Sequence, residues 1–276
     1  MRCRAAFAPL LLLVLVLGGL AACTRHVSGA GRAAPTCAAV FFGVAGSGEG
    51  PRNPAPARRP AGVDPATAQA FGPTVGSLAV QLHRLAGPHL ATAAAIDYPA
   101  IPATQYLGLG GLSPKLDASE AQGVRTLRTD VRLALAGRCA RRPVLLAGYS
   151  QGAEVVIRAV RALPAAQRAN VTVALLGNPS FQPRRPGDYP AGAGGAGLRP
   201  TFLGQAYALP ADVRARTIDV CAPGDPVCGV DPSLRSLVSR LDWVLGHLSV
   251  HDDAYAFGRA GYPRTAARFL WAHRVE

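Results

Sequence analysis

A serine between two glycines is the residue of this chain best suited to carry out chemistry. The segment Gly148-Tyr149-Ser150-Gln151-Gly152 follows an apolar run, 143–147, and precedes a helix-forming stretch. In a G-x-S-x-G turn from strand to helix, glycines are needed because a Cβ would collide with the neighbouring chain, and the serine hydroxyl is held out of the fold. A base can then take its proton and make it a nucleophile toward a carbonyl carbon. The motif predicts a hydrolase with Ser150 as nucleophile; because the chain has 31 glycines, an ordinary glycine-flanked helix start is the alternative.

A serine nucleophile also requires a base and a carboxylate that fixes the tautomer of the base. In α/β-hydrolases the carboxylate and then the histidine follow the serine along the chain. The strongest carboxylate is Asp225, which follows an apolar strand and lies in a turn rich in Pro and Gly, between Cys221 and Cys228. An aspartate that caps its own turn is the alternative. The histidines that follow Ser150 are His247, His251 and His273.

The N-terminus has the pattern of an export signal. A short basic segment is followed by an apolar run from Ala5 to Leu20 and by small residues before Cys23. Because this run is too short to span a bilayer, we predict that residues 1–22 are a signal peptide. The sequence Leu20-Ala21-Ala22-Cys23 also looks like a bacterial lipobox, in which cleavage before the cysteine is coupled to its lipidation. The alternative is an ordinary secretory signal that is cleaved slightly later.

The protein is therefore expected to be exported, either as a lipoprotein anchored at Cys23 on the outer side of the cytoplasmic membrane or as a secreted protein. Of the six cysteines, Cys3 is lost with the signal peptide and Cys23 would carry lipid. The four that remain suggest two disulfides, because an even number is typical of exported chains. Residues 23–36 are expected to be a flexible tether to one domain, 37–276.

The formal net charge is +13, and nearly all of the positive charge is arginine. The arginines are scattered rather than gathered in a stripe interleaved with aromatic residues, which argues against a nucleic-acid partner. An anionic membrane or cell-wall surface is a better partner for the same charge. The sequence has no zinc, calcium, phosphate-loop or dinucleotide motif, so we expect no metal and no cofactor. We expect a monomer.

Apolar runs alternate with helix-forming segments along the chain. The expected strands are 38–44, 91–98, 142–148, 171–176 and 216–220. The expected helices are 64–85, 118–135, 151–163, 232–245 and 263–272. Continuous apolar strands that alternate with helices are typical of a parallel sheet covered on both faces. Residues 183–200, rich in Gly, Pro and Ala, are expected to be a long surface insertion, and residues 106–114 a loop.

Three of the turns that follow these strands carry candidate site residues. In parallel sheets, ligands bind at the carboxyl ends of the strands. The glycine-rich turn 45–49, Ser150 and Asp225 each follow an expected strand, so they would share one edge of the sheet. The three segments therefore predict a single site at that edge.

Taken together, these residues resemble the cutinase family of serine esterases, in particular its exported actinobacterial members. The family's G-Y-S-Q-G pattern is matched by residues 148–152, and its C-x-x-x-D-x-x-C loop by residues 221–228. Its R-G-[ST]-x-E loop resembles residues 45–49, except that Ala45 replaces the arginine. Residues 98–100 are similar to its Y-P-A segment.

The resemblance covers about residues 37–276 and implies both a fold and a disulfide pairing. The fold would be an α/β-hydrolase, a three-layer sandwich with a central, mostly parallel sheet. The family's cysteine positions imply that Cys37 pairs with Cys139 and Cys221 with Cys228, a pairing that spacing alone does not assign.

The resemblance also implies an oxyanion hole. It would be built from the backbone N–H groups of Ser47 and Gln151, with the Ser47 hydroxyl as a further donor, and both residues lie in turns at the same sheet edge. An ordinary loop serine is the alternative for Ser47. Glu49 is expected to be solvated, with a supporting contact to the site as the alternative.

The family places its histidine after the cysteine loop, with a tyrosine within a few residues, as in His251-Asp252-Asp253-Ala254-Tyr255. We therefore favour His251 as the base. The alternative is His247, which falls at the expected end of a helix and would cap it; His273 is expected on the surface. The stretch from Asp225 to His251 is longer than is usual in the family, which predicts either a mobile histidine loop or an impaired enzyme.

The resulting hypothesis is a secreted serine esterase that hydrolyses carboxylic esters, such as acyl esters, lipids or polyesters. Ser150, His251 and Asp225 would form its triad and pass through an acyl-enzyme. One alternative keeps the acyl-enzyme but transfers the acyl group to an alcohol of the cell envelope. Another is an inactive cutinase fold that binds the envelope, which the long spacing to His251 and the missing arginine at Ala45 favour slightly.

Overall fold

The computed structural model of the protein describes residues 37–105, 114–190 and 194–275. They belong to one compact unit, Cys37–Glu276. The expected signal peptide, the lipidation site Cys23, the tether and most of the loop at 106–114 lie outside the described residues. Within the part of the chain that is described, no helix combines the length and the apolar character needed to cross a membrane.

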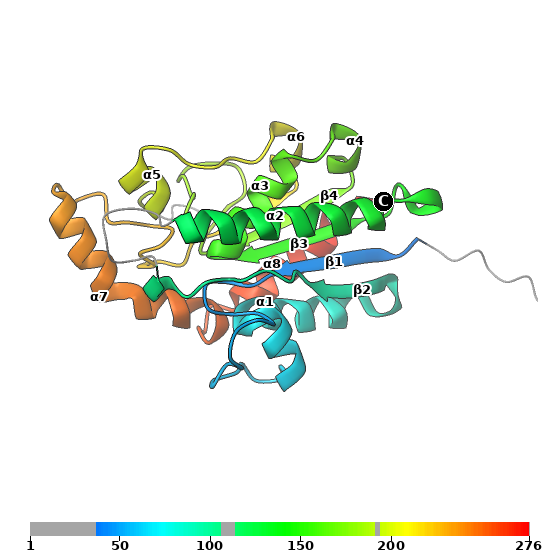
Figure 1. The fold of residues 1–276 in the computed structure, drawn as a ribbon, viewed down its shortest axis with the longest axis horizontal. Coiled ribbons are helices and arrows are strands. Elements are labelled where there is room, and N and C mark those ends of the chain that lie inside the picture. The colour runs from blue at the N-terminus through cyan, green and yellow to red at the C-terminus, as the bar shows by residue number, and fades with distance from the viewer. Residues whose placement is uncertain (1–36, 106–113, 191–193, 276) are drawn as a thin grey trace, which may run out of the picture. The chain divides into compact units, whose positions relative to one another are not determined.

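In the described residues, six strands form a parallel sheet in the order β2-β1-β3-β4-β6-β5 (Figure 1). The strands are β1 Ala39–Val44, β2 Leu90–Ala95, β3 Val144–Tyr149, β4 Val171–Leu176, β5 Asp188–Tyr189 and β6 Thr217–Val220. β1, β3 and β4 are buried along their whole length, as expected for strands that are covered on both faces. The two-residue strand β5 is the one that the sequence pattern does not predict.

Helices cover both faces of this sheet (Figure 1). The longer helices are α1 Pro65–Ala86, α2 Pro114–Ala134, α3 Gln151–Arg161, α7 Leu237–Ala256 and α8 Tyr262–Ala272. The shorter ones are α4 Ala165–Arg168, α5 Leu198–Leu203 and α6 Ala211–Arg214, with 3-10 turns at Gly87–His89, Ala103–Gln105 and Gly137–Cys139. α2 and α3 pack on one face, and α1 and α8 on the other. The result is the three-layer α/β sandwich that the alternation of strands and helices predicts.

Alternate residues of each strand point into the two helical layers. In β1, Val40 and Phe42 join the core formed with α2 and α3, whereas Phe41 joins the core formed with α1 and α8. In the resulting register Gly43 lies beside Ala147 of β3, and Ala147 beside Ala174 of β4. The carboxyl ends of these strands are therefore level, and the turns that follow them meet at one edge.

α7 is longer than the sequence pattern predicts. Ser236 caps its N-terminus by accepting a backbone N–H at 3.0 Å, and Gly246 lies inside the helix instead of ending it. One interior glycine costs a helix only about 1 kcal/mol, which the packing of the second half of α7 outweighs. His247 and His251 both lie within α7, so the predictions of a histidine loop and of a capping role for His247 are wrong.

The segment 183–200 is more than a surface insertion. It contributes β5 to the sheet and begins α5. Arg199 within it is only 5% exposed, because its guanidinium pairs with carboxylates beneath the surface, as described below. A composition rich in Gly, Pro and Ala therefore misled the sequence-based expectation for this segment.

The described residues contain two disulfides. Cys37–Cys139 ties the residues just before β1 to the 3-10 turn that follows α2 and spans 102 positions of sequence. Cys221–Cys228 spans seven positions and closes the loop after β6. The first joins remote parts of the chain, whereas the second braces one short loop.

We expect the two disulfides to differ in their contribution to stability. In the chain-entropy account, removal of Cys37–Cys139 by a double Cys→Ser change lowers the free energy of unfolding by about 4–5 kcal/mol, and removal of Cys221–Cys228 by about 2–3 kcal/mol. Urea unfolding of the two double variants and the wild type measures both values. A larger loss from the short ring would contradict this ranking.

Candidate active site

Ser150 lies at a sharp turn between β3 and α3. Its backbone angles, φ 52° and ψ −120°, fall in a region that residues with a side chain rarely adopt. A Cβ on Gly148 would come within 2.4 Å of the Gly152 carbonyl oxygen, and a Cβ on Gly152 within 2.3 Å of the Val44 carbonyl oxygen. Because only glycine fits at both positions, the turn packs closely against the end of β1 and holds Ser150 at the carboxyl edge of the sheet.

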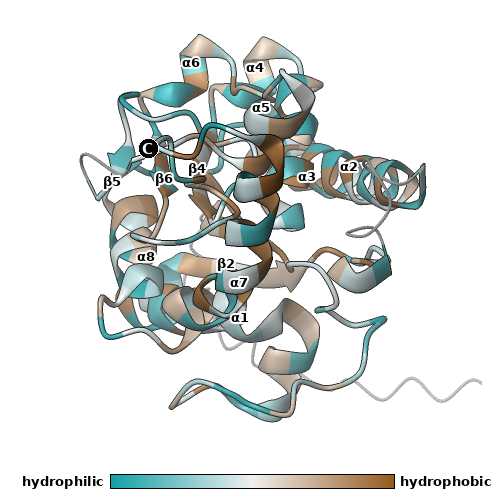
Figure 2. Ribbon diagram, turned by 90° about the vertical axis from the view of Figure 1, so that its left-hand side faces the viewer, coloured by the Kyte–Doolittle hydropathy of each residue, from teal (hydrophilic) through white to brown (hydrophobic). Residues whose placement is uncertain are grey.

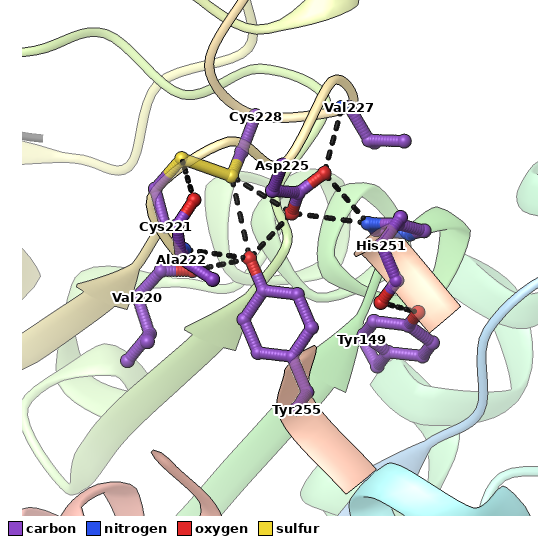
Figure 3. Close-up of polar contacts among 9 residues, drawn as sticks. All are labelled: Tyr149, Val220, Cys221, Ala222, Asp225, Val227, Cys228, His251 and Tyr255. Carbon is purple, nitrogen blue, oxygen red and sulfur yellow. Dashed lines mark hydrogen bonds and ion pairs between the residues drawn. A yellow bond between two sulfur atoms is a disulfide. The ribbon is translucent and has the colours of Figure 1, made fainter. Parts of the chain in front are cut away.

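Asp225 and His251 face each other at this edge (Figure 3). His251 Nδ1 lies 3.0 Å from each carboxylate oxygen of Asp225, and both side chains are buried. Because an ionised carboxylate only accepts hydrogen bonds, we assign the proton of the neutral imidazole to Nδ1, which leaves the lone pair on Nε2. Nε2 is buried and has no hydrogen-bond partner among the described residues. The imidazole therefore presents an unoccupied basic nitrogen.

Tyr149, the residue before Ser150, brings His251 to the serine turn. The two rings are stacked with centroids 4.8 Å apart, and the Tyr149 hydroxyl donates to the His251 carbonyl oxygen at 2.9 Å. Gly177, which follows β4, lies on another side of the imidazole, where a Cβ would be 2.5 Å from His251 Cε1. The imidazole is thus packed over the ends of β3 and β4, and Ser150 directly follows β3.

Tyr255 also contacts the Asp225 carboxylate (Figure 3). It lies one helical turn after His251, so both side chains reach the same group. Its hydroxyl donates to Asp225 Oδ2 at 2.5 Å and accepts the Ala222 N–H at 3.0 Å, while the Val227 N–H donates to Oδ1 at 2.8 Å. Burial alone would raise the pKa of Asp225, but the charge of His251 and these hydrogen bonds outweigh it and lower the pKa below its ordinary value.

The Ser47 turn lies against the start of α3. Ser47 Oγ donates to Gln151 Oε1 at 3.4 Å, and Gln151 Nε2 donates to Ser119 Oγ of α2 at 3.1 Å. The Gln151 side chain therefore links the turn after β1 to α2. The Gln151 backbone N–H belongs to the first turn of α3, whose N–H groups have no partner within the helix. Ser47 and Gln151, the two expected oxyanion donors, are thus neighbours.

The segment after β2 forms hydrogen bonds with the Ser47 turn. The Gly48 N–H donates to the Ala100 carbonyl oxygen at 2.6 Å, and the Tyr98 hydroxyl donates to the Ala45 carbonyl oxygen at 2.6 Å. Ala100 is fully buried and has a φ of 44°, a strained value for alanine. The Tyr-Pro-Ala segment therefore holds the backbone of the Ser47 turn at both of its ends.

Glu49 is not the solvated residue that the sequence suggests. Burial raises its pKa to about 7, although the Gly46 N–H, which donates to it at 3.1 Å, opposes the rise. The Glu49 side chain occupies the space beside Gly72, where a Cβ would lie 2.1 Å from Glu49 Oε2. The carboxyl group therefore braces the Ser47 turn, which agrees with the alternative of a supporting contact.

The other two histidines that follow Ser150 lie outside the cluster. His247 Nδ1 is 2.7 Å from the Trp243 carbonyl oxygen, and its ring stacks on Trp243. His273 is exposed, and its Nδ1 contacts the Phe269 carbonyl oxygen at 3.0 Å. Of the three, His251 is the one that contacts Asp225.

A buried ionic cluster joins α3 to α2 and α5, and the sequence pattern did not predict it. Arg199 donates two hydrogen bonds to Glu154, at 2.7 and 2.8 Å, and Arg158 donates to Glu120 of α2 at 2.5 Å. Burial, and then the charge of Glu154, raise the pKa of Glu120 to about 8. The cluster ties the 183–200 segment to α3, the helix that follows Ser150. Glu154 shares the polar face of α3 with Arg158 and Arg161, a pattern that predicts exposure, so no local signal pointed to the cluster.

The sequence model of the cutinase family matches residues 64–239, which is more than half of the chain. The chain belongs to the cutinase family. The matched region includes Ser150 and Asp225 and stops before His251, inside α7. Most of α7 and all of α8 therefore lie beyond the matched region at its C-terminal side.

Two curated relatives match parts of the chain. Carboxylesterase Culp1 of Mycobacterium tuberculosis is 34% identical over 102 residues, which cover 37% of this chain and 41% of the relative. Cutinase CUT1 of Coprinopsis cinerea is 30% identical over 140 residues, which cover 50% of this chain and 53% of the relative. The chain thus spans about half of the length of these relatives or less.

Solved structures agree in fold. A cutinase-like protein from Cryptococcus sp. superposes with a TM-score of 0.56 at 20% identity, over 86% of this chain and 94% of the other. An acetylxylan esterase superposes with a TM-score of 0.56 at 19% identity, over 86% and 98% of the two chains. At this identity the likeness concerns the fold, the cutinase-like α/β-hydrolase sandwich.

The strain at Ser150 has a measurable consequence. A change of Ser150→Gly relieves the positive φ, whereas Ser150→Ala retains it, so we expect the glycine variant to be more stable than the alanine variant by about 1 kcal/mol. Urea unfolding of the two variants measures the difference. An alanine variant as stable as the glycine variant would show that the turn is unstrained.

Tyr255→Phe should weaken the charged form of Asp225. Loss of a hydrogen bond to a charged group lowers the free energy of unfolding by about 1.5–3 kcal/mol at pH 7. Because the folded pKa of Asp225 is lowered, the stabilisation by this carboxylate is present above its unfolded pKa and is lost as pH falls through the folded pKa. The deficit of Tyr255→Phe should therefore shrink on acidification.

Urea unfolding between pH 7 and pH 3 measures this deficit. The matched control is Tyr262→Phe, a change in a buried tyrosine that packs against Tyr255 with ring centroids 5.7 Å apart. No hydrogen bond joins Tyr262 to Asp225 in the described structure, so its deficit should not vary with pH in this way. A pH-independent deficit for Tyr255→Phe would contradict the assigned electrostatic role.

Proposed function

We propose that the protein is an exported serine esterase that hydrolyses carboxylic esters through Ser150, His251 and Asp225. The observation that carries this proposal is the buried Asp225–His251 pair, whose imidazole stacks on Tyr149, the residue before the strained Ser150. Membership of the cutinase family and relatives named carboxylesterase and cutinase support the same reaction class.

In the proposed reaction, Ser150 Oγ attacks the ester carbonyl carbon while His251 Nε2 takes the hydroxyl proton. The imidazolium gives this proton to the leaving alcohol as the carbon–oxygen bond breaks, which leaves an acyl group on Ser150. Water then attacks the acyl-enzyme with His251 again as base. The imidazolium returns this proton to Ser150 Oγ as the acyl–oxygen bond breaks, and the acid is released. Asp225 orients the imidazole and stabilises its charged form, and Tyr255 keeps the carboxylate in position.

The negative charge that forms on the carbonyl oxygen needs donors that are already in place. The backbone N–H groups of Gln151 and Ser47 would supply them, with the Ser47 hydroxyl as the third. One such donor stabilises a transition state by about 3–4 kcal/mol. Support for this assignment comes from the contact between Ser47 and Gln151 and from the bonds that fix the Ser47 turn to Ala100 and Ala45.

The substrates proposed are acyl esters, including lipids and polyesters, that the protein meets outside the cytoplasm. Its two disulfides fit an oxidising compartment. A lipid on Cys23 would keep it on the outer side of the cytoplasmic membrane, and the net charge of +13 would favour an anionic membrane or cell-wall surface. The protein would act there as a monomer and without a cofactor.

The structure weakens the argument for an inactive fold. That alternative rested on the long stretch between Asp225 and His251 and on Ala45 in place of an arginine. The extra residues form part of α7, and His251 Nδ1 on this helix lies 3.0 Å from Asp225 Oδ1. The Ser47 turn is held by other contacts, among them the bond from Gly48 to Ala100.

Single substitutions test the proposed triad. We expect Ser150→Ala and His251→Ala each to lower kcat/KM for a para-nitrophenyl ester by about 10⁴-fold or more. His247→Ala, on the same helix but turned to Trp243, is the matched control and should retain activity. Turnover that survives Ser150→Ala would refute the assignment of the nucleophile.

The products separate hydrolysis from acyl transfer. With water as the acyl acceptor, acid and alcohol are released in equal amounts. With an envelope alcohol as acceptor, less free acid than alcohol is released. Turnover of a radiolabelled acyl donor in the presence of cell-envelope lipids, with both products counted, gives the ratio. A persistent shortfall of acid, matched by labelled lipid, would replace hydrolysis by transfer.

A further inference from the structure

The N-terminal half of α7 carries an exposed apolar stripe. Four of the seven large apolar side chains that are exposed in the described structure lie within nine residues of this helix: Leu237, Val238, Leu241 and Leu245. Their exposed fractions are 64%, 70%, 50% and 52%. At 3.6 residues per turn they fall within an arc of about 100°. We call these four residues the α7 stripe.

The stripe continues the face of α7 that packs on the domain. Steps of three and four residues keep side chains on one face of a helix, and they connect the stripe to the buried residues Val244, His251 and Tyr255. Val244 is 2% exposed and Tyr255 1% exposed, whereas Leu237 on the same face is 64% exposed. The apolar face therefore runs beyond the surface that covers its second half.

The stripe lies at the same end of the molecule as the candidate active site. Figure 1 places α7 beyond the carboxyl ends of the strands, and Figure 2 looks onto that end, where hydrophobic residues colour part of the α7 ribbon. His251 follows Leu245 on the helix by less than two turns. A surface that covers the stripe would therefore lie next to the active-site edge.

The chemistry of the stripe favours a lipid surface over a protein partner. Protein interfaces are rich in Tyr, Trp and Arg at their centres, while Leu and Val are under-represented among the residues that dominate binding. The four stripe residues are all aliphatic. Four side chains also cover much less than the roughly 800 Å² per partner of a stable protein interface, so a second copy of the chain is a poor occupant.

Charge favours a lipid surface that is anionic. The chain has a formal net charge of +13. Within residues 235–245, Arg235 precedes α7 and Arg240 lies within it, against one carboxylate, that of Asp242. An apolar helix face with arginines beside it adsorbs to a membrane interface through buried apolar area and attraction to anionic headgroups.

We propose that the α7 stripe docks the protein on an anionic lipid surface and so presents the active-site edge to esters held in that surface. The presentation of esters to the site rests on the proposed esterase function, whereas the docking itself does not need catalysis. The substrate class that follows is an ester of a lipid within a membrane or aggregate, and dissolved esters reach the same site without docking.

Vesicle sedimentation tests the docking. The full chain carries Cys23→Ala, which removes the proposed lipid attachment, and Ser150→Ala, which prevents turnover. Vesicles are equal mixtures of phosphatidylglycerol and phosphatidylcholine, with phosphatidylcholine alone for comparison. We expect the unaltered stripe to bind the anionic vesicles, and Leu241→Asp with Leu245→Asp to weaken the partition by about tenfold or more.

The matched control is Leu133→Asp, which changes an exposed leucine (68%) on α2. Leu133 lies shortly before Cys139, whose disulfide to Cys37 is next to the start of β1, away from the carboxyl edge. This variant should keep full vesicle binding and full turnover of dissolved ester. A stripe variant that binds as tightly as the control would overturn the proposal, as would a stripe-dependent dimer in sedimentation equilibrium.

A second readout separates docking from catalysis. With Ser150 intact, the ratio of turnover of a vesicle-borne ester to that of dissolved para-nitrophenyl acetate should fall by about tenfold in the stripe variant. Absence of vesicle binding with normal turnover of dissolved ester would overturn the docking and leave the esterase proposal standing. Vesicle binding without turnover of either ester would overturn the esterase proposal and leave the docking standing.

Discussion

The close backbone contact between the start of α3 and the end of β1 is the constraint on which the candidate site depends. Gly152 lies so near the carbonyl oxygens of Val44 and Ala45 that no Cβ fits, and Gly148 lies equally near Gly152. The contact sets the strained turn of Ser150 beside the Ser47 turn. The proposed nucleophile and its proposed oxyanion donors would thereby be preset in the fold, before any substrate arrives.

α7 supplies the other half of the site from a distant part of the sequence. His251 and Tyr255, one turn apart, both bond to Asp225, and Tyr149 bonds to the His251 carbonyl oxygen. Taking Asp225 out of water opposes its ionisation, yet His251 and the donors around the carboxylate keep its pKa low. A charged carboxylate is what the adjacent imidazole needs in order to act as a base.

The sequence predicts those features that depend on local pattern. Apolar runs identify β1, β3 and β4, and the spacing of glycines identifies the Ser150 turn, because both follow from nearest neighbours in the chain. It does not predict the length of α7, since the packing of that helix overrides Gly246, nor the burial of Glu49 and Arg199. Residues remote in sequence determine those environments, because Glu49 packs against Gly72 and Arg199 donates to Glu154.

A crystal structure of the protein after reaction with an alkyl fluorophosphonate tests the central claim most directly. The account predicts one adduct, on Ser150 Oγ, with the phosphoryl oxygen about 3 Å from the backbone nitrogens of Gln151 and Ser47 and with His251 still paired to Asp225. An adduct on another residue, or a phosphoryl oxygen directed away from both nitrogens, would contradict it.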